Sequence, residues 1–414
     1  MAALGLWGGA LGLSLNAVSL VTCPSGFMLS QDSLSMWMIF LRAWVTSLIV
    51  LTQFFTGLKS YLIKVFSAIL VLLIIVFRCS DLIQIYFFFE ASLIPIFIIV
   101  LGWGYQPERL PASLFLFFYT LFASLPLILF IFLVLDGAGC TLIGTVLQTT
   151  SHIKGLVFLA GIVVFLVKFP VFGVHIWLPK AHVEAPVSGS MVLAGVLLKL
   201  GGYGMLRLTP LLSGGEPFLI LAVIVLGGGG IIRVLCVATR DIKIVIALSS
   251  VVHMALIATI LKWGLLPGRE GGVIIILAHG VCSSGLFMLA NSLYERSHSR
   301  AFALNKGATT NISSVIPMFF ILVMANFGGP FTLNLLGELL IIINLNHLNW
   351  GLLIAVLPLS FFSAAYRLIL FSRVTQGPLL GPAGAGPLPA IRELQVVFIH
   401  CWPLFLRCAA PLFT

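Results

Sequence analysis

The chain has 414 residues, of which 60% are hydrophobic and 8% are charged, and its formal net charge is +10. Soluble domains carry about 25% charged residues, so this composition excludes a water-soluble protein and predicts a membrane protein. The 22 lysines and arginines are scattered without a basic run, which argues against nucleic-acid binding. The 7 cysteines include no Cys-X-X-Cys pair, which argues against an iron–sulfur cluster, a zinc site or a disulfide framework.

Apolar runs long enough to cross a bilayer predict an all-α fold, a polytopic transmembrane bundle of about 13 helices. The eleventh run is too long for one straight helix and contains Gly328, Gly329 and Pro330, so it predicts two half-helices. Pro170 and Gly173 predict a similar break near the end of the sixth run. In chain order, the expected spans lie near residues 2–21, 35–56, 60–78, 81–101, 110–135, 153–174, 187–208, 218–238, 242–262, 272–294, 312–345, 349–372 and 391–411.

The connections between these spans are mostly short and leave no room for a soluble domain, so residues 1–414 are predicted to form a single membrane domain. Interrupted helices fall at the sixth and eleventh spans, and mid-span titratable residues fall at the fourth (Glu90) and ninth (His253). Paired interrupted helices are typical of transporter repeats with a site at the membrane midplane. Only the order of the elements supports a duplication, because the two halves show no similarity residue by residue.

Four charged residues lie inside apolar runs: Glu90, Lys168, Lys199 and Glu338. An ionised group near the bilayer centre costs about 2.5–3.5 kcal/mol even on the lenient insertion scale, and such residues are usually functional. Interhelical ion pairs without a transport role are the structural alternative. For Lys168, which lies close to a helix break, the alternative is a side chain that extends to the membrane surface.

Two histidines, His253 and His279, lie in neighbouring apolar spans. Taken alone, each is as easily a hydrogen-bonded core residue as a proton carrier. Burial brings the proton affinities of lysine and glutamate toward that of histidine, so the six groups together could pass protons on. Chains of Glu, Lys and His within a membrane typically mark proton relays.

Four segments, which cover residues 168–207, 90–110, 277–300 and 335–341, closely resemble the antiporter-like subunits of respiratory complex I. The resemblance extends over nearly the whole chain. The acidic residue at Glu338 favours one branch of this family, since the sister subunits two and five typically carry lysine there. The segment LPKAHVEAP and the short length of the chain favour a mitochondrial member of the family.

This resemblance implies two inverted five-helix repeats, at about 59–208 and 218–372, between N-terminal helices (1–58) and a C-terminal helix (391–411). It also implies that Glu90 pairs with Lys168, that Lys199, His253 and His279 continue a hydrated path, and that Glu338 ends it. His175 matches the family motif as a possible accessory residue. The family usually has 14 spans, so we expect one N-terminal helix to be missing.

The function implied by the resemblance is proton translocation across the mitochondrial inner membrane, coupled to NADH oxidation and ubiquinone reduction in partner subunits. The chain is then a multi-pass subunit of a translocase, with subunits two and five and membrane lipids as partners. No cofactor or metal site is expected in this chain, and NADH, FMN, iron–sulfur clusters and ubiquinone belong to partner subunits. The N-terminus lacks a basic amphipathic transit peptide, so we expect synthesis inside the mitochondrion.

Two other functions compete with this interpretation. A cation/proton antiporter shares the ancestry, but it would normally bring longer termini and a soluble appendage. A solute transporter without a respiratory role would need a substrate pocket, and no clustered polar set suggests one.

Overall fold

The computed structural model describes residues 21–22, 28–29, 32–53, 60–144, 146, 156–208, 216–260, 266–308, 313–348, 350–378 and 391–409. Within these residues the regular structure is helical, apart from a two-residue strand pair of β1 (Val21–Thr22) and β2 (Met28–Leu29). Eight of the described helices are long and apolar enough to cross a membrane by length and composition. The predicted all-α polytopic fold is therefore confirmed, while residues 2–20 of the first predicted span lie outside the described part.

The chain divides into two compact units. The first unit consists of Met1–Phe169, Glu184–Gly189 and Val196–Leu219. The second unit consists of Pro170–Val183, Ser190–Gly195 and Ile220–Thr414.

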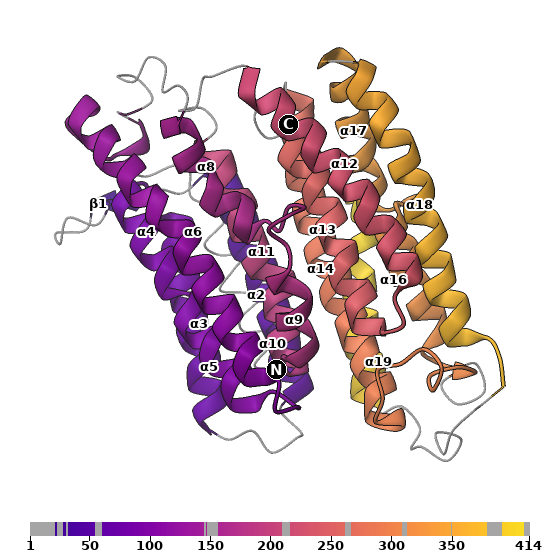
Figure 1. Cartoon of the computed structure of the whole chain (residues 1–414). Coiled ribbons are helices and arrows are strands. Elements are labelled where there is room, and N and C mark those ends of the chain that lie inside the picture. Colours follow the sequence, from indigo (N-terminus) through magenta and orange to yellow (C-terminus); the bar gives the residue numbers. More distant parts are fainter. Residues whose placement is uncertain are drawn as a thin grey trace. The chain divides into compact units, whose positions relative to one another are not determined.

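The first unit is a bundle in which neighbouring helices run side by side (Figure 1). Within it, α3 packs against α2, α4 and α5, while α6 packs against α4, α5 and α8, and α8 packs against α11. Gly139 adopts φ +70° directly after α6, a left-handed conformation that glycine reaches without strain and that ends the helix. The helices are α2 (Ser33–Gln53), α3 (Ser60–Arg78), α4 (Leu82–Ala91), α5 (Leu93–Trp103), α6 (Arg109–Ala138), α8 (Leu156–Lys168) and α11 (Leu198–Leu208).

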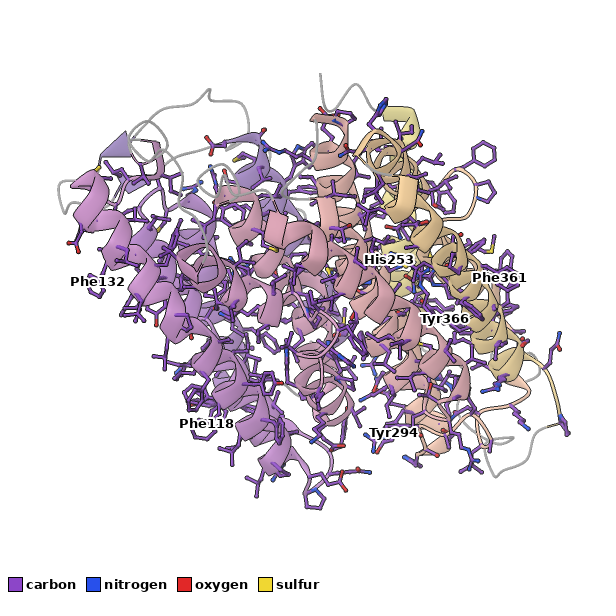
Figure 2. All side chains as sticks on the ribbon, turned by 45° about the horizontal axis from the view of Figure 1, so that its top comes forward. Phe118, Phe132, His253, Tyr294, Phe361 and Tyr366 are labelled. Carbon is purple, nitrogen blue, oxygen red and sulfur yellow. The ribbon has the colours of Figure 1, made fainter. Side chains whose placement is uncertain are left out.

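One side of α6 presents large aromatic rings to the surroundings. Phe118 and Phe132 are 53% and 56% exposed, and both project outward from the helix (Figure 2). A continuous apolar surface of this kind is costly in water, but lipid tails are as apolar as the rings themselves. The exposed side of α6 therefore suits a bilayer.

The second unit is built around two helices, α13 and α14. The α13 residues are buried along the whole helix, as expected for a helix that is apolar on every face. α14 packs against α13, α16, α17 and α19, and α18 packs against α16 and α17. The helices are α9 (Trp177–Glu184), α12 (Glu216–Ala238), α13 (Ile242–Ile260), α14 (Leu266–Ser297), α16 (Ile316–Phe327), α17 (Leu333–Leu348), α18 (Trp350–Thr375) and α19 (Ile391–Cys401).

The seventh predicted span is made of three pieces: α10 (Val187–Val192), a π-helical turn (Leu193–Leu197) and α11. Its residues are divided between the two units. The π-helical turn was not expected from the sequence. Such turns are rare and are frequent at functional sites.

Both predicted helix breaks are present, and two span boundaries were wrong. The sixth span ends at Lys168 because Pro170 lacks an N–H donor, and the short helix α9 forms where the sequence suggested only a connection. The thirteenth span is not a single helix to residue 411. α19 ends at Cys401, since Pro403 disfavours α-helical geometry at the residue before it, and a 3₁₀ segment (Trp402–Ala409) follows.

Candidate functional site

Lys168 is the last residue of α8, at the first helix break. The Phe169 N–H donates to the Phe165 carbonyl over 2.7 Å, and Pro170 then stops the ladder of helical hydrogen bonds. The Lys168 side chain is only 4% exposed. The break therefore holds an ammonium group inside the first unit, at a helix terminus where carbonyl groups lack helical partners.

The ammonium group of Lys168 meets three groups of α4. Its Nζ lies 3.4 Å from Glu90 Oε1 and donates to the Phe89 carbonyl over 3.3 Å. It also lies 3.1 Å from the centroid of the Phe89 ring, where the negative face of the ring favours a cation. Glu90 is 19% exposed, so the pair joins a buried cation to a more accessible carboxylate. This is the Glu90–Lys168 contact that the family resemblance implies.

Lys199 lies in the first unit on α11, two residues after the π-helical turn, and it is fully buried. Glycines let α11 approach α8 closely at this level. A Cβ added at Gly201 would lie 2.9 Å from the Phe169 backbone nitrogen, and one at Gly204 would overlap the Phe165 ring. The two helices that carry Lys168 and Lys199 are therefore in close backbone contact.

A second cluster surrounds His253, in the middle of α13 within the second unit (Figure 2). His253 Nδ1 lies 3.6 Å from Glu338 Oε1 of α17, and Nε2 lies 3.0 Å from Asn326 Oδ1 of α16. A guanidinium nitrogen of Arg367, from α18, also contacts Nε2. The ring of His279, from α14, lies 5.0 Å from the His253 ring. Four helices thus bring polar side chains to the imidazole that α13 carries.

Glu338 is held beside the second break, between α16 and α17. Gly328 ends α16 at φ +74°, and the Gly329 N–H donates to the Met324 carbonyl over 2.8 Å, as in a Schellman motif. A Cβ at Gly328 would lie 2.9 Å from Glu338 Oε2, so the carboxylate reaches back to the end of α16. Asn334 fixes the break by donating from Nδ2 to the Ala325 carbonyl over 2.7 Å.

Two serines, one on α13 and one on α14, donate to carbonyls of their own helices. Ser249 Oγ donates to the Ile246 carbonyl over 2.7 Å and accepts from Asn326 Nδ2 over 3.4 Å. Ser283 Oγ donates to the carbonyl of His279 over 2.7 Å. The hydroxyl lone pairs remain available as acceptors, so these groups extend the polar surroundings of both histidines.

Sequence reasoning missed three members of the second cluster: Asn326, Arg233 and Arg367. Both arginines are buried, with exposures of 2% and 3%, and both interact electrostatically with Glu338. The signal was present, since each arginine interrupts an apolar run, as Glu90 does. Position along a span does not show whether a side chain turns inward, and only the packing of α12 and α18 reveals it.

His175, the possible accessory residue, lies in the segment between α8 and α9, which belongs to the second unit. Its ring stacks on Phe172, with centroids 5.8 Å apart and planes 19° apart. The structure does not bring it into the His253 cluster, so its accessory role stays a prediction.

Among the described residues, no group of three or more His, Cys, Asp or Glu side chains could hold a metal ion. Among the cysteines whose side chains the structure describes, no two form a disulfide; these are Cys79, Cys140, Cys236, Cys282 and Cys401. The two clusters bring together carboxylate, ammonium and imidazole groups, which can take up and release protons.

The family described as "NADH:quinone oxidoreductase/Mrp antiporter, TM" matches residues 79–363. NADH-ubiquinone oxidoreductase chain 4 of Ceratitis capitata is 40% identical over 390 residues, which cover 92% of this chain and 86% of that protein. The chain 4 protein of Aedes aegypti is 44% identical over 327 residues, covering 78% of this chain and 72% of that protein.

Solved structures agree with these relatives. A chain of respiratory complex I from Thermus thermophilus matches with a TM-score of 0.85 and 25% identity, over 98% of this chain and 90% of that chain. A chain of an archaeal membrane-bound sulfane sulfur reductase matches in fold, with a TM-score of 0.84 at 19% identity. The chain belongs to the NADH:quinone oxidoreductase/Mrp antiporter transmembrane family, as a multi-pass membrane subunit of complex I of the chain 4 type.

Proposed function

We propose that this chain translocates protons through two stations, one at each interrupted helix. The observation that carries the proposal is that each break holds an ionisable pair with one buried and one partly exposed member, Lys168 with Glu90 at 3.4 Å and His253 with Glu338 at 3.6 Å. Buried ionisable groups are costly in a membrane and are retained where protons move. The relay comprises Glu90, Lys168, Lys199, His253, His279 and Glu338, with His175 as an accessory residue.

The first station stores its proton on Lys168. The Glu90 carboxylate and the Phe89 carbonyl both favour the ammonium form, whereas burial opposes it. These opposing effects leave the proton removable when a partner subunit changes the electrostatic balance. Lys199, on the tightly packed neighbouring helix, is the next carrier.

The second station passes its proton through an imidazole. His253 has Glu338 at one ring nitrogen and Asn326 at the other, which is the geometry for taking up a proton on one side and releasing it on the other. The histidine ring of His279 lies beside it as a second carrier.

Two matching junctions in the backbone support the proposal that the stations arose by duplication, in repeats at about 59–208 and 218–372. Asp81, just before α4, forms an isolated antiparallel bridge with Leu142 after α6, and Asp241, just before α13, forms one with Ala301 after α14. Both bridges are flanked by the same two backbone hydrogen bonds. These are Leu82 N–H to Thr141 O and Ile143 N–H to Ser80 O in the first, and Ile242 N–H to Arg300 O and Phe302 N–H to Arg240 O in the second.

We further propose the setting in which the stations work. The chain lies in the mitochondrial inner membrane, next to the antiporter-like subunits two and five and membrane lipids. Partner subunits carry NADH oxidation, FMN, the iron–sulfur clusters and ubiquinone reduction, and this chain converts their conformational or electrostatic signal into proton movement. The chain 4 relatives and the complex I structure support this setting.

The test uses Lys168→Met and Glu338→Gln in the assembled complex of a genetically tractable homologue. Lys64→Met and Glu270→Gln are matched controls, because both side chains are exposed on described helices. NADH oxidation and proton pumping are measured in sealed vesicles, and assembly is checked separately. Lost pumping in the first pair, with normal assembly and active controls, supports the relay. Normal pumping in the first pair makes both residues structural charges and overturns the proposal.

A further inference from the structure

The two contacts at His253 Nε2 make opposite demands on the imidazole. Asn326 Oδ1, 3.0 Å away, is an acceptor and requires a proton on Nε2. The guanidinium of Arg367 only donates, so its contact with the same atom requires a lone pair on Nε2. One nitrogen cannot satisfy both neighbours at once. The site therefore has two arrangements that differ in which neighbour bonds to Nε2.

Charged side chains from several helices lie around the His253 imidazole. Glu338 of α17 faces Nδ1, Arg367 of α18 faces Nε2, and the ring of His279, on α14, lies 5.0 Å from the His253 ring. Arg233 of α12 acts electrostatically on both Glu338 and Arg367. Its Nε and Nη1 atoms are buried and make no hydrogen bond within the described part of the chain. The single carboxylate of this group thus has two cations to neutralise.

We propose that Arg367 is a gate on the second station, which holds His253 in the form left after a proton has departed through Nε2. The proposal rests on the relay proposed above and deepens it. Arg367 is a positioning residue here, because it acts on the imidazole and carries no transferred proton itself.

Protonated Glu338 gives its proton to Nδ1 while Nε2 carries a hydrogen toward Asn326, and the ring becomes a cation beside a new carboxylate. The Nε2 proton then leaves to a water molecule, so the ring is neutral again with its hydrogen on Nδ1. The exposed Nε2 lone pair accepts from Arg367, and the guanidinium cation repels any proton that returns from that side. The ring accepts another proton from Glu338 only after Arg367 has moved off Nε2 and the imidazole has reoriented, so that the nitrogen with the lone pair faces Glu338 and the N–H faces Asn326.

The gate is tested with Arg367→Met in the assembled complex, which removes both the charge and the donors. Arg373→Met is the matched control, since Arg373 lies on the same helix and is exposed. Without the guanidinium, His253 keeps its proton to higher pH, so the alkaline limit of pumping moves up by about 1 pH unit or more. Protons pumped per NADH fall, and vesicles with an imposed pH gradient discharge faster. Arg367→Lys, which keeps the charge, restores most of the coupling.

If the methionine variant assembles poorly, Arg367→Gln tests the gate instead. Glutamine keeps an N–H donor, so this substitution removes only the charge. An unchanged pH profile and unchanged leak in either neutral variant overturn the gate. The variant Glu338→Gln distinguishes a failure of the proton relay from a failure of the Arg367 gate. If this variant pumps normally the relay itself fails, whereas if it stops pumping while Arg367→Met couples like wild type, only the gate fails.

Discussion

Replacing Glu90 by Gln tests the electrostatics of the first station. The substitution keeps the size of the side chain and removes the negative charge that lies 3.4 Å from Lys168 Nζ. At an effective dielectric constant of about 20, two unit charges at that separation attract each other by about 5 kcal/mol. Glu90 is 19% exposed, so solvent screens part of this attraction.

The expected result is a shift in the pH dependence of proton pumping. An opposite charge at this range typically favours the charged form of its neighbour by about 1–3 pH units. Removing the carboxylate makes the Lys168 ammonium easier to deprotonate. Pumping needs the protonated lysine as donor. The pH above which pumping stops should therefore be about 1–3 units lower in the variant than in the wild type.

NADH-driven pumping in sealed vesicles is measured over a range of pH, with assembly quantified for each variant. Glu108→Gln is the control, since Glu108 is exposed beside the start of α6 and contacts no buried cation in the described residues. Glu90→Asp, which keeps the charge, should shift the profile less than the glutamine variant. If the pH profile of an assembled Glu90→Gln complex superimposes on that of the wild type, the charge of Glu90 does not control the protonation of Lys168 during pumping.

Two glycine substitutions test the packing around the stations. Gly204→Ala places a Cβ against the Phe165 ring and should destabilise the complex by about 1–3 kcal/mol. The measurement is the melting temperature of the complex, which should fall. Gly102→Ala is the control, since Gly102 has open space around it and the substitution should not lower the melting temperature. Gly328→Ala combines a left-handed backbone, at about 1–2 kcal/mol, with a Cβ 2.9 Å from Glu338 Oε2. It should lower pumping even in the fraction that assembles, and equal pumping per assembled complex would contradict the placement of the carboxylate.

The sequence predicted the helical breaks well because their causes are local. Pro170 removes a donor, and Gly328 supplies a left-handed residue, so each ends its helix whatever the helix packs against. The bound of the thirteenth span was missed for the opposite reason. Apolar composition continues through residues 402–409, so hydropathy alone extends the span past Pro403.

The membership of each station was harder to predict, because it depends on contacts between distant parts of the chain. The six titratable candidates stand out by their charge in apolar runs, but charge alone does not reveal that Asn326 and Arg367 reach the same nitrogen of His253. Those contacts join α13, α16 and α18, and no local pattern fixes which faces of these helices meet. The π-helical turn before Lys199 was missed because it depends on packing of the long helix, and its residues show no local signature.

The two stations differ in charge, which gives the proposed mechanism a signature of its own. At the first station one carboxylate faces one buried ammonium, whereas at the second station two guanidinium groups surround one carboxylate. Removing the anion at Glu90 should move the alkaline limit of pumping to lower pH, and removing the cation at Arg367 should move it to higher pH. Loss of packing lowers activity at every pH and has no reason to shift the two profiles in opposite directions. Opposite shifts in two assembled variants would therefore assign both charges to the proton path.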